Sequence, residues 1–179
     1  MSLTSAHLIC KPQQSLESAA ALARTLGINA LILGDAIEGE AREVGKVMAG
    51  IAKQVHHYDQ PIEKPALLIS GGETTVTVRK KGGRGGRNAE FLLGFAEAVS
   101  GYDNIYALAA DTDGIDGTED NAGVIWSPDV ARSAAEQELK ISTYLDNNDA
   151  WSFFSAASGL VTTGPTHTNV NDFRAILIT

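Results

Sequence analysis

The sequence predicts an α/β protein with a mixed, mostly parallel sheet flanked by helices on both faces. Segments with helical spacing of apolar residues alternate with short apolar runs typical of strands, which favours helical crossovers between parallel strands. A β-branched run that follows a Gly-Gly pair indicates one hairpin within residues 69–78, so the sheet is expected to be mixed. At 44% hydrophobic residues, the 179-residue chain can bury a core of its own.

The first half of the chain supplies two predicted helices and three predicted strands. Leu16, Ala20 and Ala23 recur at helical spacing and Gly27 ends the pattern, which predicts a helix over 12–26. The other expected elements are a strand at 30–33, a helix at 40–55, a strand at 66–69, and its hairpin partner at 74–78 across Gly71 and Gly72.

The second half continues the alternation. Asn88 is a good N-cap and predicts a helix over 88–99 that begins directly after a glycine-rich segment. Ser127 and Pro128 open another helix, because serine caps a helix well and proline fits its first turn. The remaining expected elements are a strand at 105–110, a short helix capped by Asn148, and closing strands at 159–162 and 173–178.

The composition excludes several classes of protein. The net charge of −8 argues against a general nucleic-acid binder, whose surface would be broadly basic. The single cysteine, Cys10, excludes an internal disulfide and fits a reducing cytoplasm. No apolar run approaches the ~18 residues that span a bilayer, and no signal peptide opens the chain. We therefore expect a cytoplasmic protein that binds neither nucleic acid nor membranes.

A short basic segment stands out against this acidic background. Five of the 14 basic residues fall within nine positions and are interleaved with four glycines, as RKKGGRGGR at 79–87. Glycine lets a ligand approach the main chain, and arginine presents a planar fork suited to phosphate or carboxylate. The segment also leads into a predicted helix N-terminus, which favours anions. We interpret 79–88 as an anion cradle; the alternative is a flexible, solvated hairpin tip.

Three polar segments follow predicted strands, where open α/β sheets usually bind ligands. Residues 70–75 carry hydroxyls and two glycines, which can hold an anion or simply form a turn. Residues 162–172 are rich in hydroxyls and amides. Residues 111–120 hold five carboxylates, which repel one another unless they are solvated or neutralised.

The acidic segment does not fit the EF-hand pattern. One or two carboxylates that hold Mg²⁺ between phosphate groups is the functional interpretation, and a solvated acidic turn is the alternative. If Asp111, Asp113 and Asp116 help to hold Mg²⁺, replacement of Asp113 or Asp116 with asparagine should weaken the metal dependence of the full-length enzyme and change its stability little.

Three motifs in this order resemble the C-terminal MOFRL domain of two-domain glycerate 2-kinases. They are SGGETTVTV at 70–78 leading into GRGGRN at 83–88, DTDGIDG at 111–117 with DNAG at 120–123, and TGPTHTNVND at 163–172. The stretch GDAIEGEAR at 34–42 also resembles the part of those enzymes that leads into this domain. The resemblance covers nearly the whole chain. It implies that residues 1–179, with a lead-in segment at 1–60, are a single C-terminal domain of a longer enzyme.

The resemblance implies ATP- and Mg²⁺-dependent phosphorylation of D-glycerate at its 2-hydroxyl, in a cleft shared with a larger N-terminal domain that supplies a lysine. We expect neither ATP nor Mg²⁺ to bind tightly to residues 1–179 alone. Arg87, Asp113 and Asp116 are the expected catalytic residues, with Asp113 or Asp116 as general base, and Asp111 and Asp113 are the expected metal ligands. The expected substrate- and phosphate-binding residues are Ser70, Gly71, Gly72, Glu73, Thr74, Arg84, Gly85, Gly86, Asn88, Thr166, Thr168, Asn169 and Asn171. Ala89 departs from the family, which usually has glutamine there.

Two other functions stay open. Members near tartrate-utilisation genes are labelled hydroxypyruvate reductases, which use NADH or NADPH. The sequence lacks the Gly-x-Gly-x-x-Gly fingerprint of dinucleotide-binding folds, which argues against that label. It also lacks the P-loop pattern of many nucleotide-binding proteins. The third interpretation is a non-catalytic module that binds a small anion.

Overall fold

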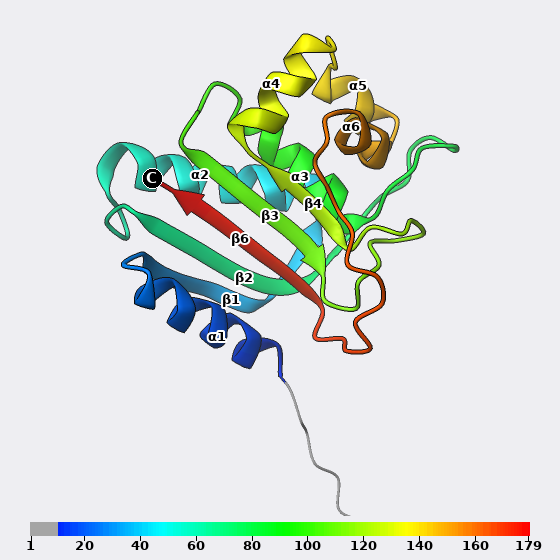
Figure 1. Ribbon diagram of the computed structural model, residues 1–179. Helices are drawn as coiled ribbons and strands as arrows, with labels where there is room; N and C mark the ends of the chain where they lie inside the picture. Colours follow the sequence, from blue (N-terminus) through cyan, green and yellow to red (C-terminus); the bar gives the residue numbers. More distant parts are fainter. Residues whose placement is uncertain (1–10) are drawn as a thin grey trace, which may run out of the picture.

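The computed structural model describes residues 11–179, which form one six-stranded sheet with helices on both faces (Figure 1). The strands are β1 (Asn29–Glu40), β2 (Ala66–Thr75), β3 (Ile105–Asp111), β4 (Gly123–Trp126), β5 (Leu160–Val161) and β6 (Asp172–Ile178). The helices are α1 (Pro12–Thr25), α2 (Ala41–Tyr58), α3 (Arg87–Ala98), α4 (Pro128–Glu136), α5 (Ile141–Asp146) and α6 (Ala150–Ala156). Cys10 lies outside the described residues.

The strand order is β1-β2-β6-β3-β4-β5. The prediction of a mixed α/β sheet is confirmed, but the expectation that it is mostly parallel is wrong. Among the described strands, only β1 and β2 pair in parallel, and the other four pairings are antiparallel. Two of these pairings join β3 to β4 and β4 to β5. The other two arise because the last strand, β6, lies between β2 and β3 and runs antiparallel to both. Helix–strand alternation in the sequence does not reveal such an insertion.

The predicted hairpin across Gly71 and Gly72 is also wrong, because both glycines lie inside the continuous strand β2. Gly72 has a φ of +115°, and a Cβ at this position would lie 2.2 Å from the carbonyl oxygen of Ile37. Strand β1 has two register shifts at this level, between Ile32 and Ile37. The glycines therefore allow β2 to pack closely against the bulged strand β1 rather than change the direction of the chain.

Each face of the sheet has its own apolar core. Helix α1 packs Leu16 and Ala20 against Ile69 on one face. The other face carries the larger core, where α2 and α3 lie behind the sheet and α4–α6 extend it (Figure 1). Phe91, Phe95 and Leu92 of α3 are completely buried there, so α3 is the central helix of the fold.

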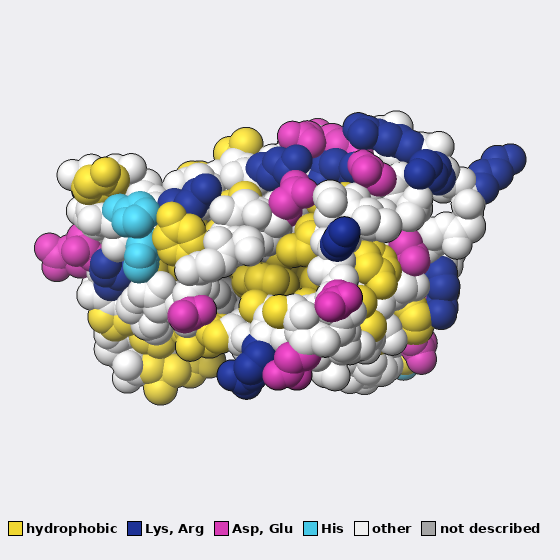
Figure 2. All heavy atoms as spheres, turned by 90° about the horizontal axis from the view of Figure 1, so that it is seen from above, with side chains coloured by type: hydrophobic (Ala, Val, Ile, Leu, Met, Phe, Trp, Pro, Cys, Tyr) yellow, Lys and Arg dark blue, Asp and Glu magenta, His cyan; other side chains and the backbone are white. Residues whose placement is uncertain are grey.

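Helix α1 covers only the β1–β2 side of its sheet face. Beyond it, Leu108, Ile125 and Leu177 line an apolar hollow of about 280 Å³. The molecule seen from above carries hydrophobic side chains in the middle of the surface, with charged side chains around them (Figure 2). A membrane-crossing helix is not found among residues 11–179.

Candidate functional site

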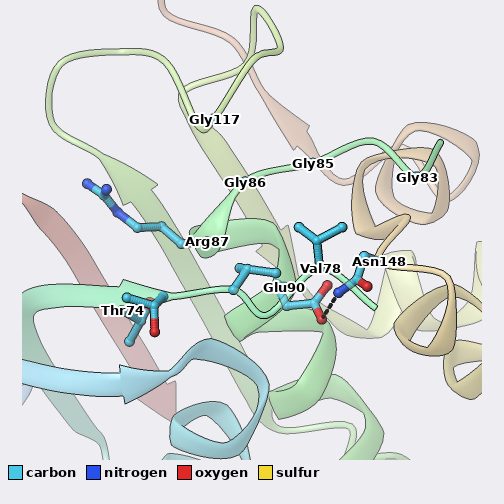
Figure 3. Close-up of a pocket in the computed structure, with 11 residues that line it drawn as sticks. Thr74, Val78, Gly83, Gly85, Gly86, Arg87, Glu90, Gly117 and Asn148 are labelled. Carbon is cyan, nitrogen blue, oxygen red and sulfur yellow. Dashed lines mark hydrogen bonds between the residues drawn. The ribbon is translucent and has the colours of Figure 1, made fainter. Parts of the chain in front are cut away.

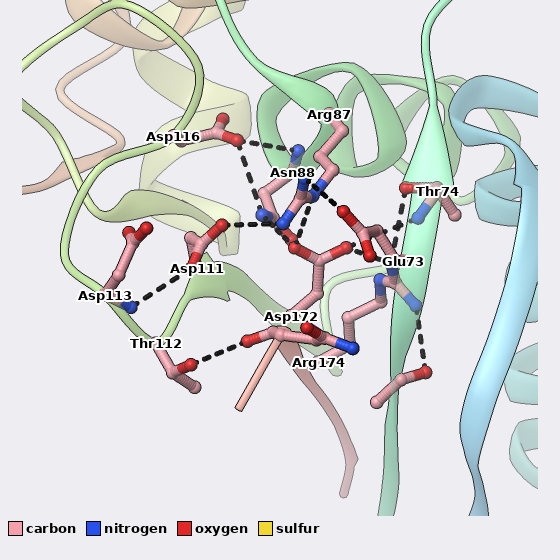
Figure 4. Close-up of polar contacts among 12 residues, drawn as sticks. Glu73, Thr74, Arg87, Asn88, Asp111, Thr112, Asp113, Asp116, Asp172 and Arg174 are labelled. Atoms are coloured by element: carbon pink, nitrogen blue, oxygen red, sulfur yellow. Dashed lines mark hydrogen bonds and ion pairs between the residues drawn. The ribbon is translucent and has the colours of Figure 1, made fainter. Parts of the chain in front are cut away.

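Arg87 lies at the centre of a carboxylate cluster at one edge of the sheet (Figure 4). Its Nε donates to Asp172 Oδ1 at 2.8 Å, its Nη1 to Glu73 Oε1 at 3.1 Å and its Nη2 to Asp111 Oδ2 at 2.7 Å. Every guanidinium nitrogen therefore faces a carboxylate. Only 26% of the Arg87 side chain is exposed, whereas 56% of the Glu73 side chain is, so Glu73 is the outermost of the three partners.

The sheet register explains why these residues meet. Asp172 opens β6 and is paired with Gly72 of β2 on one side and with Asp111 of β3 on the other. Glu73 is the next residue of β2, and Arg87 is the first residue of α3. The structure thus brings together the predicted segments 70–75 and 111–117. It does so through an antiparallel strand between them, not through adjacent parallel strand ends.

Asp172 and Arg174 form a buried ion pair beneath Arg87. Asp172 Oδ2 accepts from Arg174 Nη2 at 2.6 Å, and neither side chain is exposed. Arg174 also donates to Gly71 O and Thr74 Oγ1, each at 3.2 Å, and its guanidinium lies 4.9 Å from the centre of the Phe91 ring. Gly71 O and the Thr74 hydroxyl therefore hold Arg174 in place.

Sequence reasoning named neither Asp172 nor Arg174 as a site residue. A signal was available, because residues two apart in a strand point to the same face. Asp172 and Arg174 share their face of β6 with the buried Ile176 and Ile178. Two adjacent charged residues on a core-facing stripe require partners, since unpaired buried charge is costly.

Asp116 caps α3 from a distant loop. Its Oδ1 accepts from the backbone N–H of Asn88 at 3.0 Å, and its Oδ2 accepts from the N–H of Ala89 at 2.9 Å. The side chain is 1% exposed. The helix begins at Arg87 with Gly86 as N-cap, so the expectation that Asn88 caps it is wrong. The anion at this helix N-terminus is therefore a side chain of the protein, and Asp116 is too enclosed to contact a substrate.

The electrostatics of the cluster follow from burial. Burial raises the pKa of Asp111 to about 6, although the Asp113 N–H and Arg87 oppose the shift. Burial also raises the pKa of Asp116, against the hydrogen bonds from α3. Burial disfavours the charged form of Arg87, but Asp172, Asp111 and Glu73 outweigh it and raise the pKa of Arg87. Burial lowers the pKa of Arg174 despite its pairing with Asp172.

The predicted metal ligands, Asp111 and Asp113, do not assemble into a cation site. Asp111 accepts from Arg87 at one oxygen and from the Asp113 N–H, at 3.0 Å, at the other. Asp113 turns back on its own loop and accepts from the Ile115 N–H at 2.9 Å. Residues 11–179 contain no group of three or more carboxylate, imidazole or thiol side chains that could hold a metal ion. The residues present therefore do not fit a resident Mg²⁺.

The basic glycine-rich segment packs against the protein itself. A Cβ on Gly86 would lie 2.3 Å from Asp116 Oδ1, and one on Gly83 would lie 2.3 Å from the carbonyl oxygen of Asn147. These two glycines thus admit neighbouring parts of the chain. The backbone N–H groups of Arg79 and Arg84 donate to Asn148 and Asp149, which fixes the segment and argues against a flexible tip.

The segment also separates its two central arginines. Arg84 pairs with Glu119 and stacks 3.5 Å from the centre of the Trp151 ring. Arg87 is directed to the cluster at the sheet edge. Gly85 and Gly86 lie between them and line a cleft, described below.

The predicted residues of 162–172 hold the acidic loop in place. Thr166 donates its backbone N–H to Asp113 O at 2.9 Å and its hydroxyl to Thr112 O at 2.5 Å. Asn171 O accepts from the Thr112 hydroxyl at 2.8 Å. Asn169 accepts from the Asn171 N–H at 2.9 Å, and Thr168 O accepts from Thr166. The two loops are therefore side by side, but these polar groups mostly bind each other.

A cleft of about 440 Å³ lies beside Arg87 (Figure 3). Its lining includes Thr74, Val78, Gly86 and Glu90. Ser70, in contrast, is buried in β2. Figure 3 shows the Arg87 side chain extending away from Glu90, and Arg87 itself belongs to the lining, so the cleft is continuous with the carboxylate cluster at Arg87.

Glu90 is a further residue that sequence reasoning missed. It pairs with Arg42 of α2 and accepts from Asn148 at 3.2 Å, and 2% of it is exposed. Burial raises the pKa of Glu90 despite Arg42. The pair crosses the α2–α3 contact at the floor of the cleft.

Comparison with known proteins gives consistent results. Residues 66–172 match the MOFRL family. A protein of Agrobacterium vitis that carries a provisional hydroxypyruvate reductase name is 50% identical over 173 residues, which is 96% of this chain and 40% of that protein. The protein named D-glycerate 2-kinase of Thermotoga maritima is 42% identical over 172 residues, 96% of this chain and 41% of that protein.

The structural comparison agrees. The crystal structure of a glycerate kinase from Thermotoga maritima superposes with a TM-score of 0.92 at 41% identity, covering 97% of this chain and 42% of that one. The chain therefore spans about two fifths of the length of these relatives.

Proposed function

Because the chain belongs to the MOFRL family, we propose that residues 1–179 are the C-terminal domain of a two-domain glycerate 2-kinase. The observation that carries the proposal is the Arg87 cluster, which the three family motifs build together at one edge of the sheet. Relatives named glycerate 2-kinase align over 96% of this chain. The proposed partner is the N-terminal domain of the same enzyme, and the proposed substrates are D-glycerate and ATP.

In the proposed reaction, the 2-hydroxyl oxygen of D-glycerate attacks the γ-phosphorus of ATP, and the bond to the bridging oxygen of ADP breaks. Negative charge spreads over the transferring group, so fixed positive groups contribute most of the catalysis. Arg87 supplies such a group. Since Glu73 is its most exposed and most distant partner, an incoming anion replaces Glu73 at Nη1.

Asp113 is the proposed general base for the hydroxyl proton. Sequence reasoning left the choice between Asp113 and Asp116 open. Both oxygens of Asp116 are bound to α3, whereas Asp113 is partly exposed and holds one N–H with one oxygen. The proposal includes Mg²⁺ only as a companion of ATP and assigns it no ligands from this chain.

A dinucleotide-dependent reductase is less well supported. The only parallel pair among the described strands is β1–β2. Strand β1 runs directly into α2, and the glycine fingerprint that holds a pyrophosphate is absent from the sequence there. Relatives with the reductase name and relatives named glycerate 2-kinase both align over 96% of this chain, so their names do not distinguish the two reactions.

Assays of the full-length protein test the proposal. We expect ADP formation that depends on D-glycerate, and no oxidation of NADH or NADPH with hydroxypyruvate. The reverse result would retire the kinase assignment.

Substitution of Arg87 tests the role of this site. Arg87→Ala in the full-length protein should lower kcat/KM at least about a hundredfold, because one positioned donor to developing charge is worth that much. Arg87→Lys keeps the charge but loses the fork and should be similarly impaired. Arg132→Ala, which removes an exposed arginine paired with Asp129 on α4, is the control. Normal kinetics in a folded Arg87→Lys variant would contradict the assignment.

A further inference from the structure

We propose that Asp172 is a positioning residue that sets the orientation of the Arg87 guanidinium and is itself fixed by Arg174. This inference rests on the proposed function, in which Arg87 contacts the reacting groups. Asp172 does not contact them, because its side chain has no exposed surface. Its effect on the reaction passes through Arg87.

The contacts of Asp172 are divided between its two oxygens. Oδ2 accepts from Arg174 Nη2 at 2.6 Å, on the sheet side of the carboxylate. Oδ1 accepts from Arg87 Nε and from Asn88 Nδ2, both at 2.8 Å, on the α3 side. A carboxylate held at both oxygens cannot rotate, so it presents Oδ1 to Arg87 in one direction (Figure 4).

Arg174 provides the rigid end of this arrangement. Its Nη1 and Nη2 donate to Gly71 O and Thr74 Oγ1 of β2, and its guanidinium lies over the Phe91 ring of α3. Arg174 is therefore bound to the sheet and to the central helix at once. Because Arg174 is fixed in this way, the position of Asp172 is fixed too.

As a result, the three nitrogens of the Arg87 guanidinium have different surroundings. Its Nε lies on the buried side against Asp172, and its two terminal nitrogens face the more accessible Glu73 and the edge of β3. A planar fork held by its Nε keeps only one orientation for both terminal nitrogens. Asp172 thus leaves Nη1, the donor proposed to receive the substrate anion, aligned in advance, which is the condition for tight transition-state binding.

The alternative is a purely structural role, in which Asp172 only neutralises the buried charge of Arg174. That role needs only Oδ2. It does not account for Oδ1, which accepts from Arg87 and Asn88 of α3. The two roles predict different kinetics. A residue that acts through Arg87 has nothing to act on once Arg87 is removed, whereas a structural residue lowers activity by the same factor in either background.

The kinetic test compares Asp172→Asn, Arg87→Ala and the double variant in the full-length protein, with Asp129→Asn as control for loss of an arginine partner at a remote surface pair. We expect Asp172→Asn to lower kcat/KM about 100-fold, since small misplacement of a catalytic group has effects of this size. We expect no further loss when it is added to Arg87→Ala. Multiplication of the two single effects would overturn the proposal.

A second test does not depend on activity. In residues 1–179, the Nε–Hε group of Arg87 should give a shifted, slowly exchanging ¹⁵N–¹H signal, identified by its loss in Arg87→Lys. Asp172→Asn should return this signal to the position of exposed arginines, and Asp129→Asn should leave it in place. An unchanged Arg87 signal in Asp172→Asn would overturn the proposal.

Two precautions keep the result interpretable. If Asp172→Asn does not fold, because Arg174 is left unpaired, the Asp172→Asn/Arg174→Met variant removes both buried charges and is measured in the same way. If the wild-type enzyme shows no kinase activity, the proposed function fails while the Arg87 signal still decides whether Asp172 positions the guanidinium.

Discussion

Arg87 is surrounded by more negative charge than its own positive charge balances. Asp172 shares its charge with Arg174, but Asp111 and Glu73 both turn toward Arg87. The buried member, Asp111, responds by a pKa raised to about 6, for which burial is the main cause. Proton binding at Asp111 is therefore linked to the stability of the fold and to the availability of Arg87.

The sign of the linkage is definite. An unfolded aspartate loses its proton near its ordinary pKa of 3.8, whereas native Asp111 keeps its proton up to about pH 6. Between these values the native state binds more protons, so the free energy of unfolding falls as pH rises through this window. Because each tenfold change in proton affinity is worth about 1.4 kcal/mol, the full decrease is about 3 kcal/mol.

Asp111→Asn removes this titration while it keeps the shape of the side chain. From below pH 4 to above pH 6, the free energy of unfolding of the wild type should fall by about 3 kcal/mol relative to that of Asp111→Asn. Urea unfolding of both proteins across this range measures it. Parallel stability profiles would show that Asp111 does not carry the shifted pKa.

The sequence motifs identified charged residues of the site, but they did not show which residues each of them contacts. Arg87 and Asp111 were named from motifs, and the structure places them 2.7 Å apart. The contact that separates Arg84 from Arg87 comes from Trp151 and Glu119, far away in sequence. No local pattern distinguishes an arginine bound by a distant carboxylate from one that is free to bind a ligand.

At the scale of elements, the start of α3 depends on a loop about thirty residues further along the chain. Asp116 accepts the N–H groups of the second and third residues of α3, which is the task of an N-cap side chain. Gly86, the actual N-cap, has no side chain to do this. Sequence reasoning assigned the cap to the nearest suitable residue, Asn88, because a cap from another loop leaves no local signal.

Asp116→Asn should therefore destabilise the protein, contrary to the small effect expected from the sequence. The asparagine oxygen can still accept one of the two N–H groups of α3, but its NH₂ group then faces the other. The unsatisfied buried N–H should lower the free energy of unfolding by about 1–3 kcal/mol. Asp113→Asn is the matched control, because Asp113 is partly exposed and caps only its own turn. Urea unfolding of the two variants compares them. Equal stability would mean that Asp116 does not cap α3.

The contact between α2 and α3 gives a second test at this scale. Gly45 faces α3, where a Cβ would lie 2.2 Å from the carbonyl oxygen of Phe91, whereas a Cβ on Gly50 would meet nothing within 4 Å. We expect Gly45→Ala to lower the free energy of unfolding by about 1–3 kcal/mol, because the added methyl group overpacks the helix contact. Gly50→Ala should raise it by about 0.5–1 kcal/mol, because alanine favours the helix over glycine. Thermal unfolding of both variants should move in opposite directions. A neutral Gly45→Ala would show that the helices can separate without cost.

Elements with a strong local pattern were predicted well. The helix at 88–99 and the strand at 105–110 match α3 and β3 to within one residue at each end. The four-residue strand β4 and the six-residue helix α5 were missed. Both are short, so their periodicity is weak, and their positions are set by packing against α3 and the sheet.

At the scale of the whole molecule, the site depends on a feature that the sequence does not reveal. The last strand enters the middle of the sheet, and its first residue, Asp172, is the buried centre of the cluster. Motifs separated by about a hundred residues meet only because β6 lies between β2 and β3. Helix–strand alternation predicted the layers of the fold correctly, but strand order is decided by long-range pairing.

The same arrangement bears on the proposed function, because this site has few positive groups to offer a phosphoryl group. All three nitrogens of Arg87 are occupied by carboxylates of the same chain. Within residues 11–179, Arg174 is the other cation of the cluster, and it is fully buried. The relatives named glycerate 2-kinase are more than twice as long as the region that they share with this chain.

We therefore expect residues 1–179 alone to show no ATP-dependent phosphorylation of D-glycerate, whereas the full-length enzyme turns over. Phosphoryl transfer depends on several positive groups set around the transferring oxygens, and a single arginine already bound to three carboxylates cannot supply them. ADP release, measured with equal concentrations of the two proteins, decides the question. Circular dichroism of residues 1–179 serves as the control for folding. Addition of the separately produced N-terminal part should restore activity, because under the proposed function it supplies the other wall of the catalytic cleft. Steady turnover by residues 1–179 alone would show that this domain holds the complete site.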